Sequence, residues 1–281
     1  MKIEKRKSVV KTSAPASSGS MFSVSSGYRL PTSDFRLPRP RVSVIIPALN
    51  EEKSIAPVIT AIPREWVDEV IVVDNGSSDA TAVRASQQGA RVITQSERGY
   101  GAACLAGIGA VDSLCEIIVF LDADYSDYPE DMELLLRPII DGRADLVLST
   151  RTRDRETIAA LTPQQRWGNR LATTLIRWRF GFRYTDLGPF RAIRRDVLER
   201  LAMTDRNFGW TVEMQIKAAQ RGLRIVEIPM RYRVRIGRSK ISGTLKGTIL
   251  AGTKILYTIF KYWMISRNEQ KQWQADAEPL R

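Results

Sequence analysis

The chain has 281 residues and a formal net charge of +12, with 43% hydrophobic and 26% charged residues. This composition is ordinary for a soluble globular protein, and the length suffices for one large domain or two small ones. The chain has no histidine, which excludes histidine-based catalytic triads and zinc sites that need imidazole. It has only two cysteines, which excludes a disulfide framework and favours a reducing cytoplasm.

Charge is unevenly distributed along the chain. Residues 41–150 carry eight basic and eighteen acidic side chains, whereas residues 221–267 carry eleven basic and one acidic. An acidic half followed by a basic half indicates a cation-binding site beside a surface for phosphates. Basic chains often bind nucleic acid, but no nucleic-acid-binding motif occurs here and the acidic block would repel a phosphate backbone. We therefore expect no nucleic-acid partner.

Residues 1–40 are rich in Ser, Pro, Lys and Arg and lack hydrophobic periodicity, which predicts a disordered basic tail. The basic residues at 2–11 are not followed by a continuous apolar segment, so we expect no secretory signal. We assign the catalytic domain to residues 41–235 and a basic, amphipathic, helical segment to residues 236–281.

From residue 41 onward, short runs of β-branched residues alternate with helical patterns. The runs predict strands at 42–47, 70–74, 91–94, 117–122 and 145–149, and the patterns between them predict helices at about 54–61, 79–88, 102–113 and 129–141. Near-continuous apolar strands that alternate with helices predict an α/β fold with a mostly parallel, Rossmann-like sheet covered by helices on both faces.

Polar residues follow the ends of the predicted strands, at Asn50–Glu51, Asp74–Asn75, Ser96–Arg98 and Asp122–Asp124. In an open α/β sheet, ligands bind at this carboxyl edge. A plain dehydrogenase is a competing hypothesis, but Gly99–Cys104 lacks the third glycine of the dinucleotide motif and follows the third strand instead of the first. Gly76–Ser78 also lacks the pattern of a P-loop.

Asp122 and Asp124 are the sharpest feature of this edge. Two carboxylates spaced two residues apart after a buried strand can hold Mg²⁺ or Mn²⁺ that bridges a diphosphate. The alternative is a turn followed by a helix cap, because Asp127 and Pro129–Glu130 open a helix. The apolar strand before the pair, together with the acidic ends of the other strands, favours the metal site.

Several ordered segments resemble family-2 glycosyltransferases of the GT-A fold. They are Val44–Glu52, Val70–Asp79 and Val119–Asp124. Three further segments are similar to the branch that transfers sugars to dolichyl or polyprenyl phosphate, namely Tyr125–Glu130, Thr185–Arg191 and Arg238–Gly243. The resemblance covers about residues 41–255.

The resemblance implies a role for each of these positions. It assigns the nucleotide sugar to Pro47, Asn50, Glu51, Asp74, Asp79, Arg98, Gly99 and Asp122, and a Mg²⁺ or Mn²⁺ ion to Asp122 and Asp124. We expect Asp124 to be the direct metal ligand. Plain turn geometry is the alternative for Asp74, Arg98 and Gly99.

The family often keeps an acidic residue near the acceptor, and Asp186 and Glu213 are the candidates for a catalytic role. Glu213 also begins a predicted helix at 212–221, where a negative charge is favourable without any function. Basic residues suited to an acceptor phosphate are Arg191, Arg235, Arg238 and Lys240. The alternative is a solvated edge strand whose arginines only keep it soluble.

Residues 245–265 are the best membrane candidate, but Lys246, Lys254 and Lys261 leave no apolar span long enough to cross a bilayer. Their spacing predicts a helix that lies at a membrane surface, and residues 171–182 form a second amphipathic stretch. The alternative is that both helices only pack on the core.

We therefore expect a metal-dependent, inverting transferase that moves a hexose from a nucleotide diphosphate sugar to polyprenyl phosphate. The expected location is the cytoplasm, peripheral on the inner face of the membrane. The alternatives are a soluble or lipid hydroxyl acceptor, a sugar-1-phosphate nucleotidyltransferase and a non-catalytic binder. The nucleotidyltransferase would need a glycine-rich, basic first loop where Pro47–Asn50 stands, and an intact Asp122 and Asp124 argue against the binder.

Overall fold

The computed structural model describes residues 39–151, 155–237 and 245–264. All of them belong to the unit that begins at Pro38. The predicted N-terminal tail therefore falls almost entirely outside the described residues, and so do Arg238 and Lys240.

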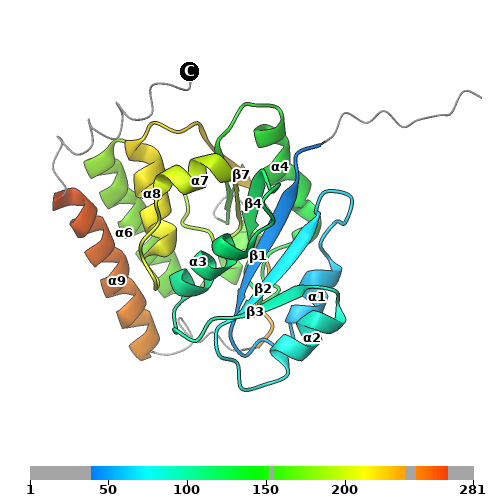
Figure 1. Ribbon diagram of the computed structural model, residues 1–281. Coiled ribbons are helices and arrows are strands. Elements are labelled where there is room, and N and C mark those ends of the chain that lie inside the picture. Colours follow the sequence, from blue (N-terminus) through cyan, green and yellow to red (C-terminus); the bar gives the residue numbers. More distant parts are fainter. Residues whose placement is uncertain (1–38, 152–154, 238–244, 265–281) are drawn as a thin grey trace, which may run out of the picture. The chain divides into compact units, whose positions relative to one another are not determined.

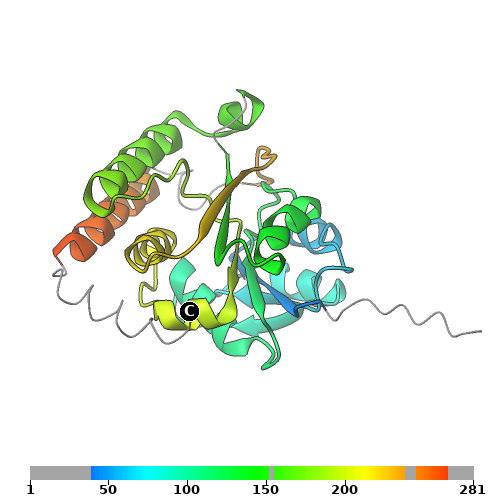
Figure 2. The same cartoon turned by 90° about the horizontal axis from the view of Figure 1, so that it is seen from above.

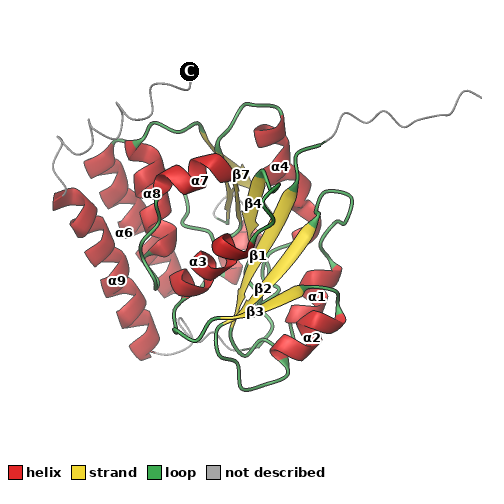
Figure 3. Cartoon of the chain, viewed as in Figure 1, coloured by secondary structure: helices red, strands yellow, loops and turns green. Residues whose placement is uncertain are grey.

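A mostly parallel sheet forms the centre of the fold (Figure 3). Its strands in the described residues are β1 (Val42–Ala48), β2 (Glu69–Asp74), β3 (Arg91–Thr94), β4 (Ile117–Phe120), β5 (Leu146–Thr150), β6 (Arg191–Arg194) and β7 (Ile225–Pro229), in the order β3-β2-β1-β4-β6-β5-β7. Only β6 runs antiparallel to its neighbours β4 and β5. The five predicted strands agree with the structure to within two residues, which confirms the predicted α/β class.

Helices cover both faces of the sheet (Figure 1). They are α1 (Ile55–Thr60), α2 (Thr81–Gln87), α3 (Tyr100–Ala110), α4 (Met132–Ile140, preceded by a 3₁₀ turn at Pro129–Asp131), α5 (Arg155–Ala160), α6 (Pro163–Phe180), α7 (Arg195–Leu201), α8 (Trp210–Gln220) and α9 (Leu245–Met264). Side chains alternate along β1, so that Val44 and Ile46 pack with α1 and α4 while Ile45 packs with the side that carries α3 and α8.

Helices α6 and α9 lie side by side beyond α8 (Figures 1 and 2). Helix α6 starts with a capping box, in which the Thr162 hydroxyl accepts from the Gln165 amide and the Gln165 side chain accepts from the Thr162 amide. On α9, Ile259 and Tyr262 are buried in the core cluster that also holds α8. Residues 245–264 therefore contribute to the same hydrophobic core as α6 and α8.

Candidate active site

The loops after β1 and β2 are joined by hydrogen bonds at the carboxyl edge of the sheet. The Asn75 amide donates to the Ala48 carbonyl at 2.9 Å, and the Asn50 side chain accepts from the Ser78 amide at 2.7 Å. Asn50 itself has a left-handed backbone, with φ of 52°. The structure thus brings the first two predicted nucleotide-binding segments together, and Pro47 lies beside them within β1, opposite Val73.

Two acidic residues of the predicted nucleotide site hold these loops in shape. Asp74 is buried at the end of β2 and accepts from the Ser77 amide at 3.1 Å. Asp79 accepts from the Glu52 amide at 3.2 Å and from the Thr81 amide at 3.0 Å, at the start of α2. Both residues lie at the carboxyl edge of the sheet, while their contact with a nucleotide stays a prediction.

The loop before α3 is tied to β2 and to the segment before α8. Arg98 donates to the Gly76 carbonyl at 3.1 Å, and the Gly99 amide donates to the Asn75 side chain at 2.8 Å. A side chain on Gly99 would overlap the carbonyl oxygen of Arg206. Close packing therefore explains why a glycine stands at position 99. The predicted contact of this loop with the nucleotide stays a prediction.

Asp122 and Asp124 follow β4 and lie at the same edge. Asp122 accepts from the Tyr100 hydroxyl at 3.1 Å, and burial, together with the charge of Asp124, raises its pKa to about 7. Asp124 accepts from the amide and the hydroxyl of Ser126, at 2.9 and 2.6 Å. Three residues on, the carboxyl of Asp127 is buried, one of its oxygens has no hydrogen-bond partner in the described structure, and burial and the charge of Asp122 raise its pKa well above the usual range.

The donor set fits a hard divalent cation that is shared with a ligand. Burial and mutual repulsion disfavour two charged carboxylates at Asp122 and Asp124, and a cation between them would relieve both effects. No group of three or more acidic or sulfur ligands assembles a complete metal cage in the described ranges. Mg²⁺ and Mn²⁺ commonly use one or two carboxylates together with phosphate oxygens and water, so the pair suffices.

Asp186 lies under the same edge of the sheet and is paired with Arg151. The Arg151 guanidinium donates to both carboxylate oxygens, at 2.8 and 3.0 Å, and the amides of Arg151 and Leu187 donate as well. Burial alone would raise the pKa of Asp186, but the charge and hydrogen bonds of Arg151 outweigh it and lower the pKa. Arg151 was missed in the sequence; a basic residue directly after β5 was the available signal.

Glu213 requires a correction, because it is no candidate base. Its carboxylate is fully buried and accepts hydrogen bonds from the Asp205 amide at 2.7 Å, the Tyr262 hydroxyl at 2.6 Å and the Thr204 amide and hydroxyl, and it is ion-paired with Lys217 at 2.8 Å. Burial would raise its pKa, yet Lys217 and Tyr262 lower it. Glu213 therefore ties α8 and α9 to the segment before α8.

Arg191 requires a second correction. It is fully buried in β6, where its guanidinium donates to the carbonyls of Gly188 and Thr211. Burial lowers its pKa. Such a residue cannot meet an acceptor at the surface, so the predicted contact with the acceptor is wrong. Sequence pattern could not reveal this, since arginine is rarely buried so completely.

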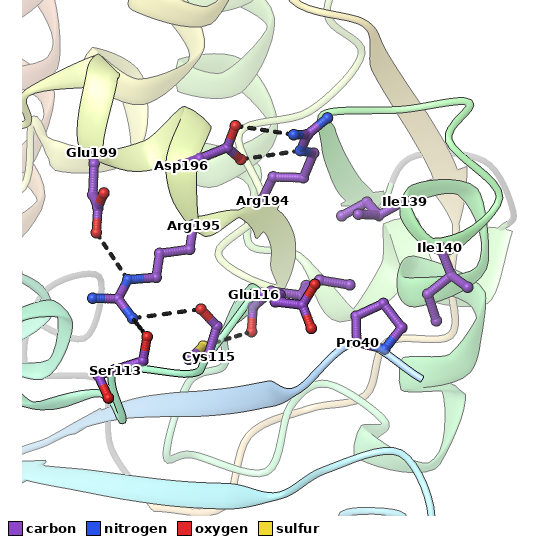
Figure 4. Close-up of a pocket in the computed structure, with 11 residues that line it drawn as sticks. Pro40, Ser113, Cys115, Glu116, Ile139, Ile140, Arg194, Arg195, Asp196 and Glu199 are labelled. Carbon is purple, nitrogen blue, oxygen red and sulfur yellow. Dashed lines mark hydrogen bonds and ion pairs between the residues drawn. The ribbon is translucent and has the colours of Figure 1, made fainter. Parts of the chain in front are cut away.

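A cavity of about 500 Å³ lies away from this edge (Figure 4). Its lining includes Pro40, Cys115 and Glu116, which precede β1 and β4, so it opens at the amino ends of the parallel strands. Arg194 and Arg195 also line it and are ion-paired with Asp196 and Glu199. This cavity shares no residue with the Asp122–Asp124 site.

The sheet order, the joined loops and the two aspartates after β4 define a GT-A nucleotide-sugar transferase. The chain belongs to glycosyl transferase family 2, whose family model matches residues 43–202. It is an enzyme of that family and uses a nucleotide sugar as donor.

Relatives and solved structures agree with this assignment. An uncharacterized glycosyltransferase of Mycobacterium bovis is 36% identical over 229 residues, which cover 80% of this chain and 97% of the relative. A dolichyl-phosphate hexose transferase of Haloferax volcanii is 34% identical (71% and 86% covered), and an undecaprenyl-phosphate mannosyltransferase of Micrococcus luteus is 31% identical (74% and 90%). A solved structure of glucosyl-3-phosphoglycerate synthase from Mycobacterium tuberculosis, with Mn²⁺, UDP-glucose and phosphoglyceric acid, is 27% identical, covers 81% of each chain and has a TM-score of 0.64.

Proposed function

We propose that this enzyme transfers a hexose, with inversion and with the help of Mg²⁺ or Mn²⁺, from a nucleotide diphosphate sugar to a polyprenyl phosphate. Two relatives that carry dolichyl phosphate or undecaprenyl phosphate in their names support this acceptor class. The solved relative with Mn²⁺ and UDP-glucose supports the metal and the donor class.

The acceptor proposal rests mainly on the partners and the pKa shifts of the carboxyl groups near Asp122. Asp186 is held by the Arg151 guanidinium, and its lowered pKa makes it a weak base. Burial and the charge of Asp122 raise the pKa of Asp127, which disfavours the charged form of that carboxyl group. A hydroxyl acceptor needs a base, whereas a phosphate monoester, with a second pKa of about 6, is already mostly deprotonated at neutral pH.

In the proposed reaction, Asp122 and Asp124 would hold the cation, which offsets negative charge on the leaving diphosphate. The Arg151 side chain is only 14% exposed and its guanidinium lies 5.2 Å from the centre of the Tyr232 ring, so it is fixed where it can orient an acceptor phosphate. An oxygen of that phosphate attacks the anomeric carbon. The bond from that carbon to the diphosphate oxygen breaks, and the nucleoside diphosphate leaves with the electron pair.

We also propose that the face formed by α6 and α9 lies on an anionic membrane surface. In the described part of the chain, seven of the eleven exposed large hydrophobic side chains belong to these two helices, namely Trp167, Trp178, Leu250, Leu256, Tyr257, Phe260 and Met264. Neither helix contains an acidic residue, and exposed Arg170, Arg177 and Lys261 accompany the apolar side chains. Apolar and basic side chains together are the composition that binds anionic lipid surfaces.

The inner side of helix α6 contacts the segment of the proposed acceptor site. Near the start of α6, Asn169 donates to the Thr185 carbonyl at 3.2 Å and accepts from the Leu187 amide at 2.9 Å, on either side of Asp186. Helix α6 therefore contacts the segment around Asp186 with its inner side and carries part of the proposed membrane face on its outer side. In the described ranges, no helix is both long enough and apolar enough to span a bilayer, and peripheral attachment at the inner face is the arrangement we propose.

A second candidate acceptor is the hydroxyl group of a small phosphorylated acid, because the solved relative was crystallised with phosphoglyceric acid. The two acceptors are separated by supplying tritiated UDP- and GDP-sugars with either a membrane lipid extract or phosphoglyceric acid. We expect label to enter the organic phase only in the presence of lipid extract and a divalent cation. Label that stays in a water-soluble glycoside of phosphoglyceric acid would contradict the lipid acceptor.

A further inference from the structure

Arg235 bridges two acidic residues that belong to different parts of the candidate active site. One guanidinium nitrogen lies 2.6 Å from Oε1 of Glu51, which follows β1, and another lies 3.1 Å from Oδ2 of Asp124, which follows β4. All three side chains are largely buried, with exposures of 23%, 10% and 11%. The contact therefore lies in a partly shielded environment, where ion pairs are stronger than at an open surface.

The backbone fixes Arg235 in this position. The Ile236 amide donates to the Asp124 carbonyl and the Arg233 amide donates to the Ser126 carbonyl, both at 2.9 Å. Asp127 and Tyr232 form an antiparallel bridge beside them. The chain from 232 to 236 thus runs along the Asp124 loop, and residue 235 stands between two hydrogen-bonded positions.

The same carboxylate oxygen is the one that a divalent cation needs. Oδ1 of Asp124 already accepts two hydrogen bonds from Ser126, which leaves Oδ2 as the available metal ligand. That oxygen is the partner of Arg235. A guanidinium and a divalent cation on one oxygen would repel each other.

Arg235 also keeps an unused hydrogen-bond donor. Its Nε atom is buried and has no hydrogen-bond partner in the described structure. Guanidinium N–H groups make strong hydrogen bonds to phosphate oxygens, so Arg235 can offer the Nε–H and, separately, the N–H groups of the nitrogen that leaves Asp124.

We propose that Arg235 and the divalent cation are alternative partners of Asp124, and that binding of the metal transfers Arg235 from Asp124 to a phosphate of the bound nucleotide diphosphate. This inference rests on the metal-dependent function proposed above. It adds that the binding of the metal and the binding of the nucleotide are coupled through Arg235. By linkage, the nucleotide must then tighten metal binding by the same factor as the metal tightens nucleotide binding.

The test measures Mn²⁺ affinity by the electron paramagnetic resonance signal of free Mn²⁺, with and without UDP or GDP. Without nucleotide, Arg235→Gln should bind Mn²⁺ roughly fivefold more tightly than the unaltered protein, the lower end of ordinary coupling between two ligands. Addition of nucleotide should raise the Mn²⁺ affinity of Arg235→Gln by a smaller factor than it raises that of the unaltered protein. Arg235→Lys keeps the charge but cannot reach both carboxylates as a fork, so its Mn²⁺ affinity should lie between those of Arg235→Gln and the unaltered protein. This variant also provides the test if Arg235→Gln fails to fold.

Arg231→Gln is the matched control. It removes the same charge from the same segment, but Arg231 pairs with Asp131 at 2.6 Å, outside the metal site. Its Mn²⁺ affinity should equal that of the unaltered protein. Equal or weaker Mn²⁺ binding by Arg235→Gln, or the same gain in Arg231→Gln, would overturn the inference while leaving the proposed function intact. Absence of nucleotide-dependent Mn²⁺ binding in the unaltered protein would instead contradict the metal-dependent function and the inference with it.

Discussion

The Tyr262 hydroxyl on α9 donates a hydrogen bond to the buried Glu213 carboxylate on α8, with 2.6 Å between the two oxygens. Glu213 also holds the amides of Thr204 and Asp205, and the neighbouring Arg206 carbonyl accepts from the Ala102 amide on α3. One carboxylate thus joins the C-terminal helix to the segment that packs on the loop before α3. Its role is structural, and its removal should be felt in stability.

We expect Tyr262→Phe to lower the free energy of unfolding by about 1.5–3 kcal/mol, because it removes a buried hydrogen bond to a charged group. Tyr257→Phe on the same helix is the control, since Tyr257 is 59% exposed. Urea denaturation followed by circular dichroism measures both. Equal stability of the two variants would show that the bond contributes nothing.

Glu213 also predicts a pH dependence of stability. Its pKa in the folded protein is lowered from 4.5, so the unfolded chain binds the proton more readily. The stabilisation is therefore complete above about pH 4.5 and is lost as the pH falls through the folded-state pKa. The stability difference between the unaltered protein and Glu213→Gln should shrink on acidification below pH 4.5. A difference that stays constant or grows in acid would mean that the lowered pKa is wrong.

Asp124→Asn should abolish Mn²⁺-dependent binding of UDP or GDP while leaving the circular dichroism spectrum unchanged. The cause is the loss of a charged metal ligand at a position whose backbone is held by Ile236. Tyr100→Phe should weaken metal binding less, because it only removes the hydrogen bond that orients Asp122. Calorimetry of nucleotide binding with and without Mn²⁺ decides this, and unchanged metal-dependent affinity in Asp124→Asn would remove that residue from the metal site.

Replacement of Arg170, Arg177 and Lys261 by Glu should release the protein from anionic vesicles. Each basic residue near such a surface contributes roughly a fivefold factor in affinity. Lys254 was expected from the sequence to face the membrane, but its ammonium group is paired with Asp205 at 2.9 Å, so it is left out of this variant. Reversal of the exposed Arg64, Arg84 and Arg143, outside α6 and α9, is the control for total charge. If the control protein dissociates as readily in co-sedimentation, the α6–α9 face is not the membrane surface.

The sequence predicted the first five strands well because buried parallel strands such as Val70–Asp74 are almost continuous runs of β-branched residues. It did not predict β6, since Arg191–Arg194 has charged residues at both ends and pairs antiparallel to two distant strands. The carboxyl edge could be located because strand direction alone places Asp74 and Asp122 there. Whether a charged residue at that edge is exposed or buried depends on long-range partners, which is why Glu213 and Arg191 were misassigned and Arg151 was missed.

The variant Asp186→Asn distinguishes a phosphate acceptor from a hydroxyl acceptor. If the acceptor is a phosphate, this variant should lose rate modestly, through poorer positioning of Arg151, and should keep the pH–rate profile of the unaltered protein. If Asp186 were the base for a hydroxyl acceptor, the rate should fall by about 10²–10⁴-fold and the acid limb of the profile should disappear.

The most direct measurement compares two acceptors that differ only in the phosphate, a polyprenyl phosphate and the free polyprenol of the same chain length, in vesicles of the same composition. With the nucleotide sugar that the enzyme accepts and with Mn²⁺ present, we expect sugar transfer to the polyprenyl phosphate and none above background to the polyprenol, because the Asp186 carboxylate is already held by the Arg151 guanidinium and two backbone amides and is a poor base for a hydroxyl group. Transfer to the polyprenol at a comparable rate would contradict it.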